Sequence, residues 1–220
     1  MSVNTTKIID ELVAARLAET SVLRGVKPAD DSSKESYEKY MGEFAGVRGR
    51  PLFYNYMGTG RGTGPYVELK DGSVKLDFIN GIGVHIFGHG HPSVLKASVE
   101  GSLADILMQG HLQMNQEYLD FSQKVISMAK GSRLKHGWIC PSGSMANENA
   151  LKMARQKNSP ARHIIAMKDS FAGRTTMMAE VTDNPKYKVG LPEYNEVLRI
   201  PFYDKNCLLY TSPSPRDGLL

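Results

Sequence analysis

The sequence has few of the features that mark a secreted, disulfide-stabilised or membrane-spanning protein. Its 220 residues include two cysteines, Cys140 and Cys207, which are too few for a disulfide framework. No apolar run approaches the roughly 20 residues needed to span a bilayer. The chain starts with an acidic, amphipathic segment and lacks the basic region followed by an apolar one that forms a secretory signal. We therefore expect a soluble cytoplasmic protein with no membrane segment.

Charge of one sign is not concentrated anywhere in the chain. The 27 basic and 23 acidic residues give a net charge of +4 that is spread along the sequence, whereas nucleic-acid binders usually carry a basic stripe. A metal site is not indicated either. His89 and His91 lie two residues apart, but no cysteine or carboxylate stands at ligand spacing, and Gly90 and Pro92 indicate a turn. We predict structural roles for both histidines, no bound metal and no nucleic-acid partner.

The segment 207–220, CLLYTSPSPRDGLL, differs in composition from everything before it. It is rich in serine and proline and has neither helical nor strand periodicity. Its first part also resembles the translation of an adapter used in preparing sequencing libraries. We expect the gene's own sequence to end at about Asn206 and the rest to be an artefactual tail. The alternative is a natural proline-rich tail.

The pattern of apolar residues predicts an α/β fold. After Gly131 strands and helices alternate, which is typical of a mainly parallel sheet covered by helices, with ligands at the carboxyl ends of the strands. The run of glycines at 58–64 does not fit a dinucleotide-binding pattern and is interpreted as a flexible connector. The expected helices are 4–24, 34–44, 93–106, 116–130, 145–157 and a short one from Gly173, the expected strands are 137–140, 163–167 and 197–201, and a hairpin joins 66–69 to 74–78.

The segment Ser142-Gly143-Ser144 lies between a predicted strand and a predicted helix. A glycine and small residues let the backbone approach a bound group closely, and the start of a helix presents unpaired N–H groups and a positive dipole end. The arrangement suits an anion, with the Ser144 hydroxyl as a further donor. On spacing alone, a plain N-cap of a core helix is an equally good interpretation. On the outer face of this helix, Glu148 and Lys152 are predicted to form an i,i+4 pair.

Phe171 and Arg174 lie in a loop directly after the next predicted strand. An aromatic ring and an arginine at the same sheet edge could stack on a planar ring and bind a carboxylate. Taken separately, a phenylalanine is more often a core residue and an arginine more often a surface charge. Their position beside a predicted anion site favours the functional interpretation.

Three motifs in order resemble class III aminotransferases, the family of ornithine, acetylornithine and 4-aminobutyrate aminotransferases that depend on pyridoxal 5'-phosphate (PLP). They are KLDFINGIGVHIFGHGHPSV, CPSGSMANENALKMAR and IIAMKDSFAGRTTMM. The resemblance implies a truncated fold type I PLP-dependent transferase. It suggests an N-terminal helical segment at 1–48, the N-terminal part of the small domain with its connection at 49–110, the first part of the large αβα PLP-binding domain at 111–206, and the tail at 207–220.

The resemblance also implies roles for single residues. Ser142, Gly143 and Ser144 would bind the cofactor phosphate, and Phe171 would stack on the pyridine ring. For the substrate, Arg174 would bind a carboxylate and Ile82 would line the pocket. Two departures from the family pattern put substrate choice in doubt, namely Met145 where many members have Glu, and Ala172 where they have His or Trp.

The resemblance implies that this chain contains no catalytic residue of the family. The lysine that forms the Schiff base and the aspartate that pairs with the pyridine nitrogen would both lie beyond its end, so we expect the chain itself to be inactive. The full-length protein would be a homodimer that transfers an amino group from an ω-amino donor to a 2-keto acid such as 2-oxoglutarate. The alternatives are an aminomutase of the same fold and a non-catalytic phosphate-binding protein.

Overall fold

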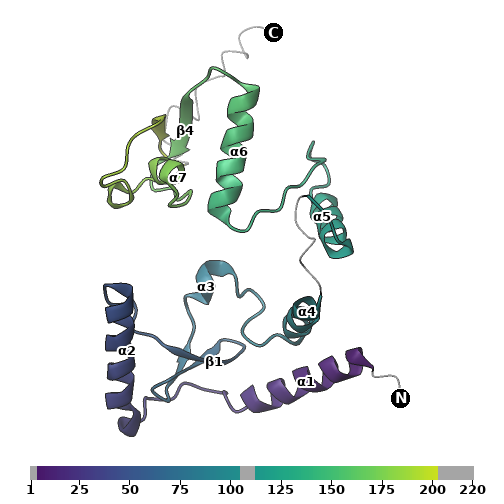
Figure 1. Cartoon of the computed structure of the whole chain (residues 1–220), viewed down its shortest axis with the longest axis vertical. Helices are drawn as coiled ribbons and strands as arrows, with labels where there is room; N and C mark the ends of the chain where they lie inside the picture. Colours follow the sequence, from purple (N-terminus) through teal and green to yellow (C-terminus); the bar gives the residue numbers. More distant parts are fainter. Residues whose placement is uncertain (1–3, 105–111, 203–220) are drawn as a thin grey trace. The chain divides into compact units, whose positions relative to one another are not determined.

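The computed structural model describes residues 4–104 and 112–202 and divides the chain into two compact units, residues 1–108 and 109–220 (Figure 1). The predictions for Cys207, for the tail 207–220 and for the end of the helix at 93–106 lie outside the described residues. The expected domain divisions at 48/49, 110/111 and 206/207 stay predictions.

The first unit begins with two helices that the sequence predicts. Helix α1 spans Thr5–Thr20 and α2 spans Lys34–Arg48, preceded by the 3₁₀ turn η1, Asp31–Ser33. The side chain of Asn4 caps α1 by accepting a hydrogen bond from the N–H of Lys7 at 3.1 Å. The helix ends at Thr20 rather than at residue 24, and the hydroxyls of Thr20 and Ser21 donate to carbonyls near its end, a local competition that disfavours further helix.

An antiparallel three-stranded sheet follows in the first unit, with strand order β1-β2-β3. The strands are β1 (Gly58–Thr63), β2 (Tyr66–Leu69) and β3 (Val74–Leu76), so the predicted hairpin is confirmed. The flexible connector predicted at 58–64 is wrong, because β1 pairs with β2 through the backbone. Backbone pairing needs no apolar side chains, so the apolar periodicity of the sequence does not indicate this strand.

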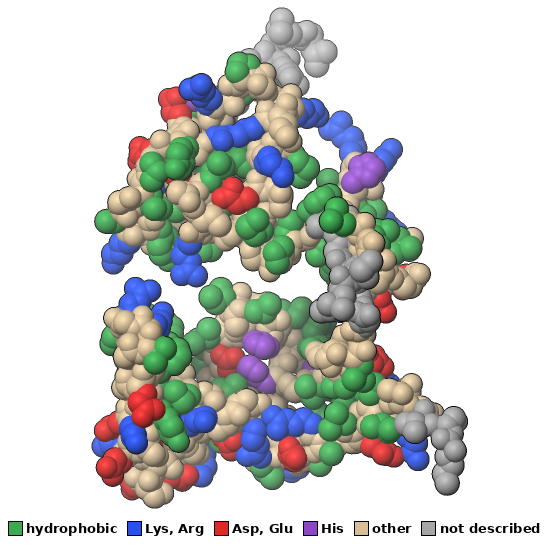
Figure 2. All heavy atoms as spheres, in the orientation of Figure 1, with side chains coloured by type: hydrophobic (Ala, Val, Ile, Leu, Met, Phe, Trp, Pro, Cys, Tyr) green, Lys and Arg blue, Asp and Glu red, His purple; other side chains and the backbone are tan. Residues whose placement is uncertain are grey.

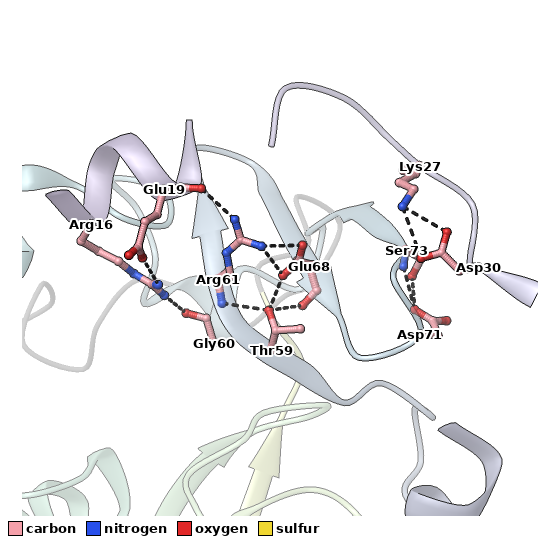
Figure 3. Close-up of polar contacts among 10 residues, drawn as sticks. All are labelled: Arg16, Glu19, Lys27, Asp30, Thr59, Gly60, Arg61, Glu68, Asp71 and Ser73. Atoms are coloured by element: carbon pink, nitrogen blue, oxygen red, sulfur yellow. Dashed lines mark hydrogen bonds and ion pairs between the residues drawn. The ribbon is translucent and has the colours of Figure 1, made fainter. Parts of the chain in front are cut away.

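Charged side chains tie α1 to this sheet (Figure 3). The Arg61 guanidinium donates to both carboxylate oxygens of Glu68, at 2.9 and 3.0 Å, and to the carbonyl of Glu19 at 2.7 Å. The guanidinium of Arg16 donates to the Glu19 carboxylate at 3.1 Å and to the carbonyl of Gly60 at 2.7 Å. Both arginines therefore join the end of α1 to β1.

The first unit also contains the helices α3 (Asn80–Gly83) and α4 (Pro92–Leu103).

The second unit contains a parallel pair of strands, as predicted. Strand β4 (His163–Met167) pairs in register with β5 (Glu196–Ile200). Between them lie the short helix α7 (Thr176–Val181) and the 3₁₀ turn η2 (Pro185–Tyr187), while α5 (Gln116–Met128) and α6 (Gly143–Lys157) precede β4. Helices α6 and α7 pack against each other. Among the described residues, 137–140 is not assigned to a strand, so the strand predicted there is not confirmed.

The carboxyl end of α7 is held by an arginine from β5. The Arg199 guanidinium donates to the carbonyls of Val181 at 2.6 Å, Glu180 at 2.8 Å and Thr182 at 3.2 Å. These are carbonyls that a helix leaves unpaired at its end, where a positive charge is also favourable. The buried Glu180 carboxylate in turn accepts hydrogen bonds from the backbone N–H of Tyr194 and the side chain of Asn195. The position of α7 is thus fixed by polar contacts as well as by packing.

Large apolar side chains are exposed on both units, as Figure 2 shows. In the first unit they include Phe53, Phe78 and Ile82, and in the second Phe171 and Val189. Within the part of the chain that the structure describes, no helix is both long enough and apolar enough to cross a bilayer.

Candidate functional site

The predicted phosphate-binding segment forms the first turn of α6. The helix begins at Gly143, two residues earlier than predicted, with Ser142 as its N-cap. The Ser142 hydroxyl oxygen accepts a hydrogen bond from the N–H of Met145 at 3.3 Å. In residues 4–104 and 112–202, the N–H groups of Gly143 and Ser144 find no acceptor. Two free backbone donors therefore stand at the positive end of a helix of four turns.

The loop at 171–175 meets this end of α6. Gly173 is buried and has a φ of 138°, and a Cβ atom added to it would lie 2.4 Å from Ser144 Oγ and 2.8 Å from Ser144 Cβ. The space beside Ser144 is thus filled by the Gly173 backbone. At Gly143 the opposite holds, because an added Cβ atom would meet nothing within 4 Å. One side of the helix start is closed by the loop, and the side at Gly143 is open.

Four side chains that had no predicted role in the site connect the loop to its surroundings. The Asn147 amide donates to the carbonyl of Ala172 at 2.7 Å, and the Thr175 hydroxyl donates to the Glu148 carboxylate. The Thr182 hydroxyl binds the backbone of Ala172 and Gly173. The predicted pair of Glu148 with Lys152 is not formed among the described residues, where the Glu148 carboxylate accepts instead from the half-buried Thr175 hydroxyl. Asn147 and Glu148 stand three and four residues after Ser144, and this spacing on a helix is the sequence feature that places them on the same face as Ser144.

The two predicted ligand-facing side chains of the loop are exposed. The Phe171 side chain is 65% exposed, and its ring meets the ring of Tyr187 edge-on at a centroid distance of 6.2 Å. Arg174 is exposed, and in the described ranges it forms neither a hydrogen bond nor an ion pair. The structure therefore brings Ser142–Ser144 and residues 171–174 together, and it leaves the Phe171 ring and the Arg174 guanidinium accessible.

Ile82 belongs to the first unit and lies in a left-handed turn. Its φ and ψ are 59° and 43°, an uncommon conformation for a β-branched residue, and its side chain is 95% exposed. One carboxylate oxygen of Asp77 accepts from the N–H groups of Ile79 and Asn80, both at 2.9 Å. The other lies 2.7 Å from Nε2 of His89. The N–H of Asn80 and then the His89 ring hold the pKa of Asp77 below its usual range.

The histidines are thus engaged in structure. His89 also exchanges two backbone hydrogen bonds with Gly64, and its ring lies 4.5 Å from the ring of His85. His91 lies next to Phe87, with a ring centroid distance of 5.4 Å. Among the residues with described positions, no group of three or more His, Cys, Asp or Glu side chains is placed to hold a metal ion.

Comparison with known proteins identifies the family. The sequence profile of the aminotransferase class-III family matches residues 49–212, which are more than half of the chain. The chain belongs to this family. An acetylornithine aminotransferase from Bacillus cereus is 38% identical over 150 residues, which cover 67% of this chain and 37% of that enzyme. A probable 4-aminobutyrate aminotransferase from Bacillus subtilis is 33% identical over 145 residues, covering 64% of this chain and 33% of the relative.

Solved structures of transaminases agree with this assignment. An amine transaminase from an uncultivated Pseudomonas species, in its PLP-bound form, is 25% identical with a TM-score of 0.58, and the match covers 74% of this chain and 36% of that one. The fold is that of a fold type I PLP-dependent transferase, of which the chain contains a part. The chain spans about 37% of the length of the Bacillus cereus relative.

Membership of the class III aminotransferase family indicates PLP as the cofactor. The start of α6 has the donors and the space that the phosphate of PLP needs. Two free N–H groups, the Ser144 hydroxyl and open space at Gly143 provide donors and room for a dianion. The N-cap bond uses the oxygen of Ser142 as an acceptor, so its hydroxyl proton stays available to an acceptor on the ligand.

Proposed function

We propose that the full-length protein is a PLP-dependent aminotransferase that moves an amino group from an ω-amino donor to a 2-keto acid such as 2-oxoglutarate. The donor is released as an aldehyde or keto acid, and the acceptor becomes an amino acid. The observation that carries the proposal is the start of α6, where unpaired backbone donors adjoin the loop with Phe171 and Arg174. Relatives named as acetylornithine and 4-aminobutyrate aminotransferases support an ω-amino donor.

Each residue has a distinct task in this proposal. Gly143 and Ser144 bind the phosphate through backbone N–H groups, and Ser142 and Ser144 add hydroxyl donors. Phe171 covers one face of the pyridine ring, and Arg174 binds the substrate carboxylate in a two-pronged pair. Ile82 lines the substrate pocket, a role that rests on the sequence resemblance. PLP, when bound, supplies the carbonyl carbon that takes up the amino group and a ring that withdraws electrons from it.

These residues bind and orient rather than transfer protons. A helix start and a guanidinium act by placing fixed positive charge where the anionic groups of cofactor and substrate settle. By the sequence resemblance, the family's lysine and its ring-pairing aspartate would lie in a part of the full-length protein that this chain does not include. A homodimer and a cytoplasmic location are further parts of the proposal, and they rest on the sequence resemblance.

The test is an amino-transfer assay on the complete gene product. With an ω-amino donor, product should form only when 2-oxoglutarate is present, and Arg174→Gln should raise the KM for a carboxylate-bearing donor more than it lowers kcat. Amino-group migration within one molecule, without an acceptor, would instead identify an aminomutase. PLP binding without any turnover would favour a non-catalytic phosphate-binding protein.

A further inference from the structure

The backbone between Phe171 and Arg174 is held by side chains on two sides. On one side, the Asn147 amide donates to the carbonyl of Ala172 at 2.7 Å. On the other, the Thr182 hydroxyl oxygen accepts from the N–H groups of Ala172 at 2.9 Å and Gly173 at 3.2 Å, and its proton goes to the Gly173 carbonyl at 2.9 Å. Both polar groups of Ala172 are therefore satisfied by side chains and not by regular secondary structure.

These contacts continue the face of α6 on which Ser144 lies. Residues three and four positions apart on a helix are neighbours on its surface. Asn147 and Glu148 stand at these spacings from Ser144, and they reach Ala172 and Thr175 while Ser144 itself packs against Gly173. One helix face thus contacts three of the five residues of the loop at 171–175. The same helix face therefore carries a phosphate donor and the side chains that hold the loop.

The two site side chains take no part in this attachment. Phe171 is 65% exposed, and in the described ranges Arg174 has no polar partner. The loop backbone is fixed while the side chains that would meet a ligand remain free. Such an arrangement lowers the entropy cost of binding, because the backbone is already ordered before the ligand arrives.

We infer that Asn147 and Thr182 are positioning residues that hold the loop at 171–174 against the first turns of α6, so that a ring-binding and a carboxylate-binding side chain stand at a fixed distance from the phosphate donors. The inference deepens the proposed function and rests on it for the identity of the ligand. The attachment itself is a property of the chain without ligand and is tested separately.

The central comparison is Asn147→Ala with Asn149→Ala. The two asparagines lie two positions apart on α6, but the Asn149 amide donates to the Met145 carbonyl and to the sulfur of Cys140, and not to the loop. Amide hydrogen exchange of Ala172 and Gly173 in the ligand-free 220-residue chain should be about three- to ten-fold faster in Asn147→Ala, the loss expected for one hydrogen bond. Asn149→Ala should leave it unchanged.

A second pair of variants tests the other side of the loop. Thr182 is 1% exposed, so Thr182→Val keeps the shape but removes the hydroxyl, while Thr182→Ser keeps the hydroxyl. Exchange at Ala172 and Gly173 should rise in Thr182→Val and return towards the wild-type rate in Thr182→Ser. If Thr182→Val fails to fold, the exchange rates of Asn147→Ala, a substitution at an exposed residue, still test the attachment of the loop.

The affinities for PLP and for inorganic phosphate distinguish a positioning role from a merely structural one, which would not change PLP affinity selectively. Asn147→Ala should weaken PLP binding about three- to ten-fold and leave inorganic phosphate binding at the start of α6 unchanged. Equal exchange rates in the wild type, Asn147→Ala and Thr182→Val would overturn the inference, and so would parallel losses of PLP and phosphate affinity. If the wild-type chain binds neither PLP nor phosphate, the proposed function fails, and the exchange rates alone then decide whether the attachment exists.

Discussion

Residues 58–64 in the first unit and residues 141–144 in the second are both rich in glycine and small polar residues, but they use their backbone N–H groups differently. The first segment forms β1, and its backbone pairs with β2 and, at Gly64, with His89. The second segment opens α6, where two N–H groups have no acceptor among the described residues. Glycine content therefore does not identify an anion site. The element that follows the glycines decides whether backbone donors are free.

The glycine with the tightest surroundings at the candidate site is Gly173, which lies outside both segments. Gly173→Ala would place a methyl group 2.8 Å from Ser144 Cβ and 3.0 Å from Met178 Cβ, at a φ of 138°. We expect the second unit to lose about 2–4 kcal/mol of stability through overpacking and backbone strain. Denaturant unfolding, followed through amide signals of this unit, measures the loss.

A matched control separates the clash from the strain. Gly190 also has a positive φ, of 74°, but an added Cβ would meet nothing within 4 Å. Gly190→Ala should cost only about 1 kcal/mol. Equal costs for the two substitutions would contradict the tight contact between Gly173 and α6.

The next largest effect is expected in β1. A methyl group in Gly62→Ala would lie 2.9 Å from the Cβ of His89 and 3.1 Å from the carbonyl oxygen of Tyr66. We predict a loss of about 1–3 kcal/mol in the first unit, with phosphate binding unchanged. Gly58→Ala on the same strand meets only ordinary contacts at 3.8 Å or more and should cost less. A loss of phosphate affinity in Gly62→Ala would show that the strand, too, contributes to anion binding.

Gly143→Ala should raise stability and lower phosphate affinity, whereas Gly62→Ala should lower stability and leave phosphate affinity unchanged. A methyl group there meets nothing within 4 Å, and alanine is the better helix former, so stability should rise by about 0.5–1 kcal/mol. Phosphate affinity should nevertheless fall, because the methyl group occupies the open side of the helix start. Gly46→Ala, inside α2 and also without neighbours within 4 Å, is the control for the propensity effect. Unchanged phosphate affinity in Gly143→Ala would place the anion elsewhere.

The smallest effect concerns pH and the turn that carries Ile82. The N–H of Asn80 and the His89 ring lower the pKa of Asp77, so its ionised form stabilises the folded state. This stabilisation is fully present above the unfolded pKa of about 3.9 and is lost as the pH falls through the lower pKa of the folded state. The stability difference between the wild type and Asp77→Asn should therefore shrink between pH 6 and acid pH. A difference that does not change with pH would contradict this assignment.

Much of the fold follows from local patterns in the sequence. Strand β4 has the predicted bounds, and α6 and the hairpin of β2 and β3 were also found, because apolar spacing and the Asp71-Gly72 turn are local signals. Strand β1 lies next to its partner β2 in the sequence, but its glycine-rich segment pairs through the backbone and has no apolar alternation from which a strand could be predicted. The strand expected at 137–140 is not found among the described residues.

The candidate site divides in the same way. Ser142–Ser144, Phe171 and Arg174 could be selected because their residue types and their positions after predicted strands suit a ligand. Asn147 and Thr182 could not, because their partners are backbone atoms 25 and 10 residues away in sequence. Contacts to the backbone leave no complementary side chain to recognise. The contribution of such residues becomes apparent only in three dimensions.

The most direct test of the account is a titration of the isotope-labelled chain with PLP, with pyridoxal, which lacks the phosphate, and with inorganic phosphate. We predict that PLP and phosphate shift the amide signals of Gly143 and Ser144, that pyridoxal does not, and that only PLP also shifts the ring signals of Phe171. Phosphate-dependent shifts that cluster elsewhere, or equal shifts with pyridoxal and PLP, would contradict the claim that the start of α6 binds the cofactor phosphate.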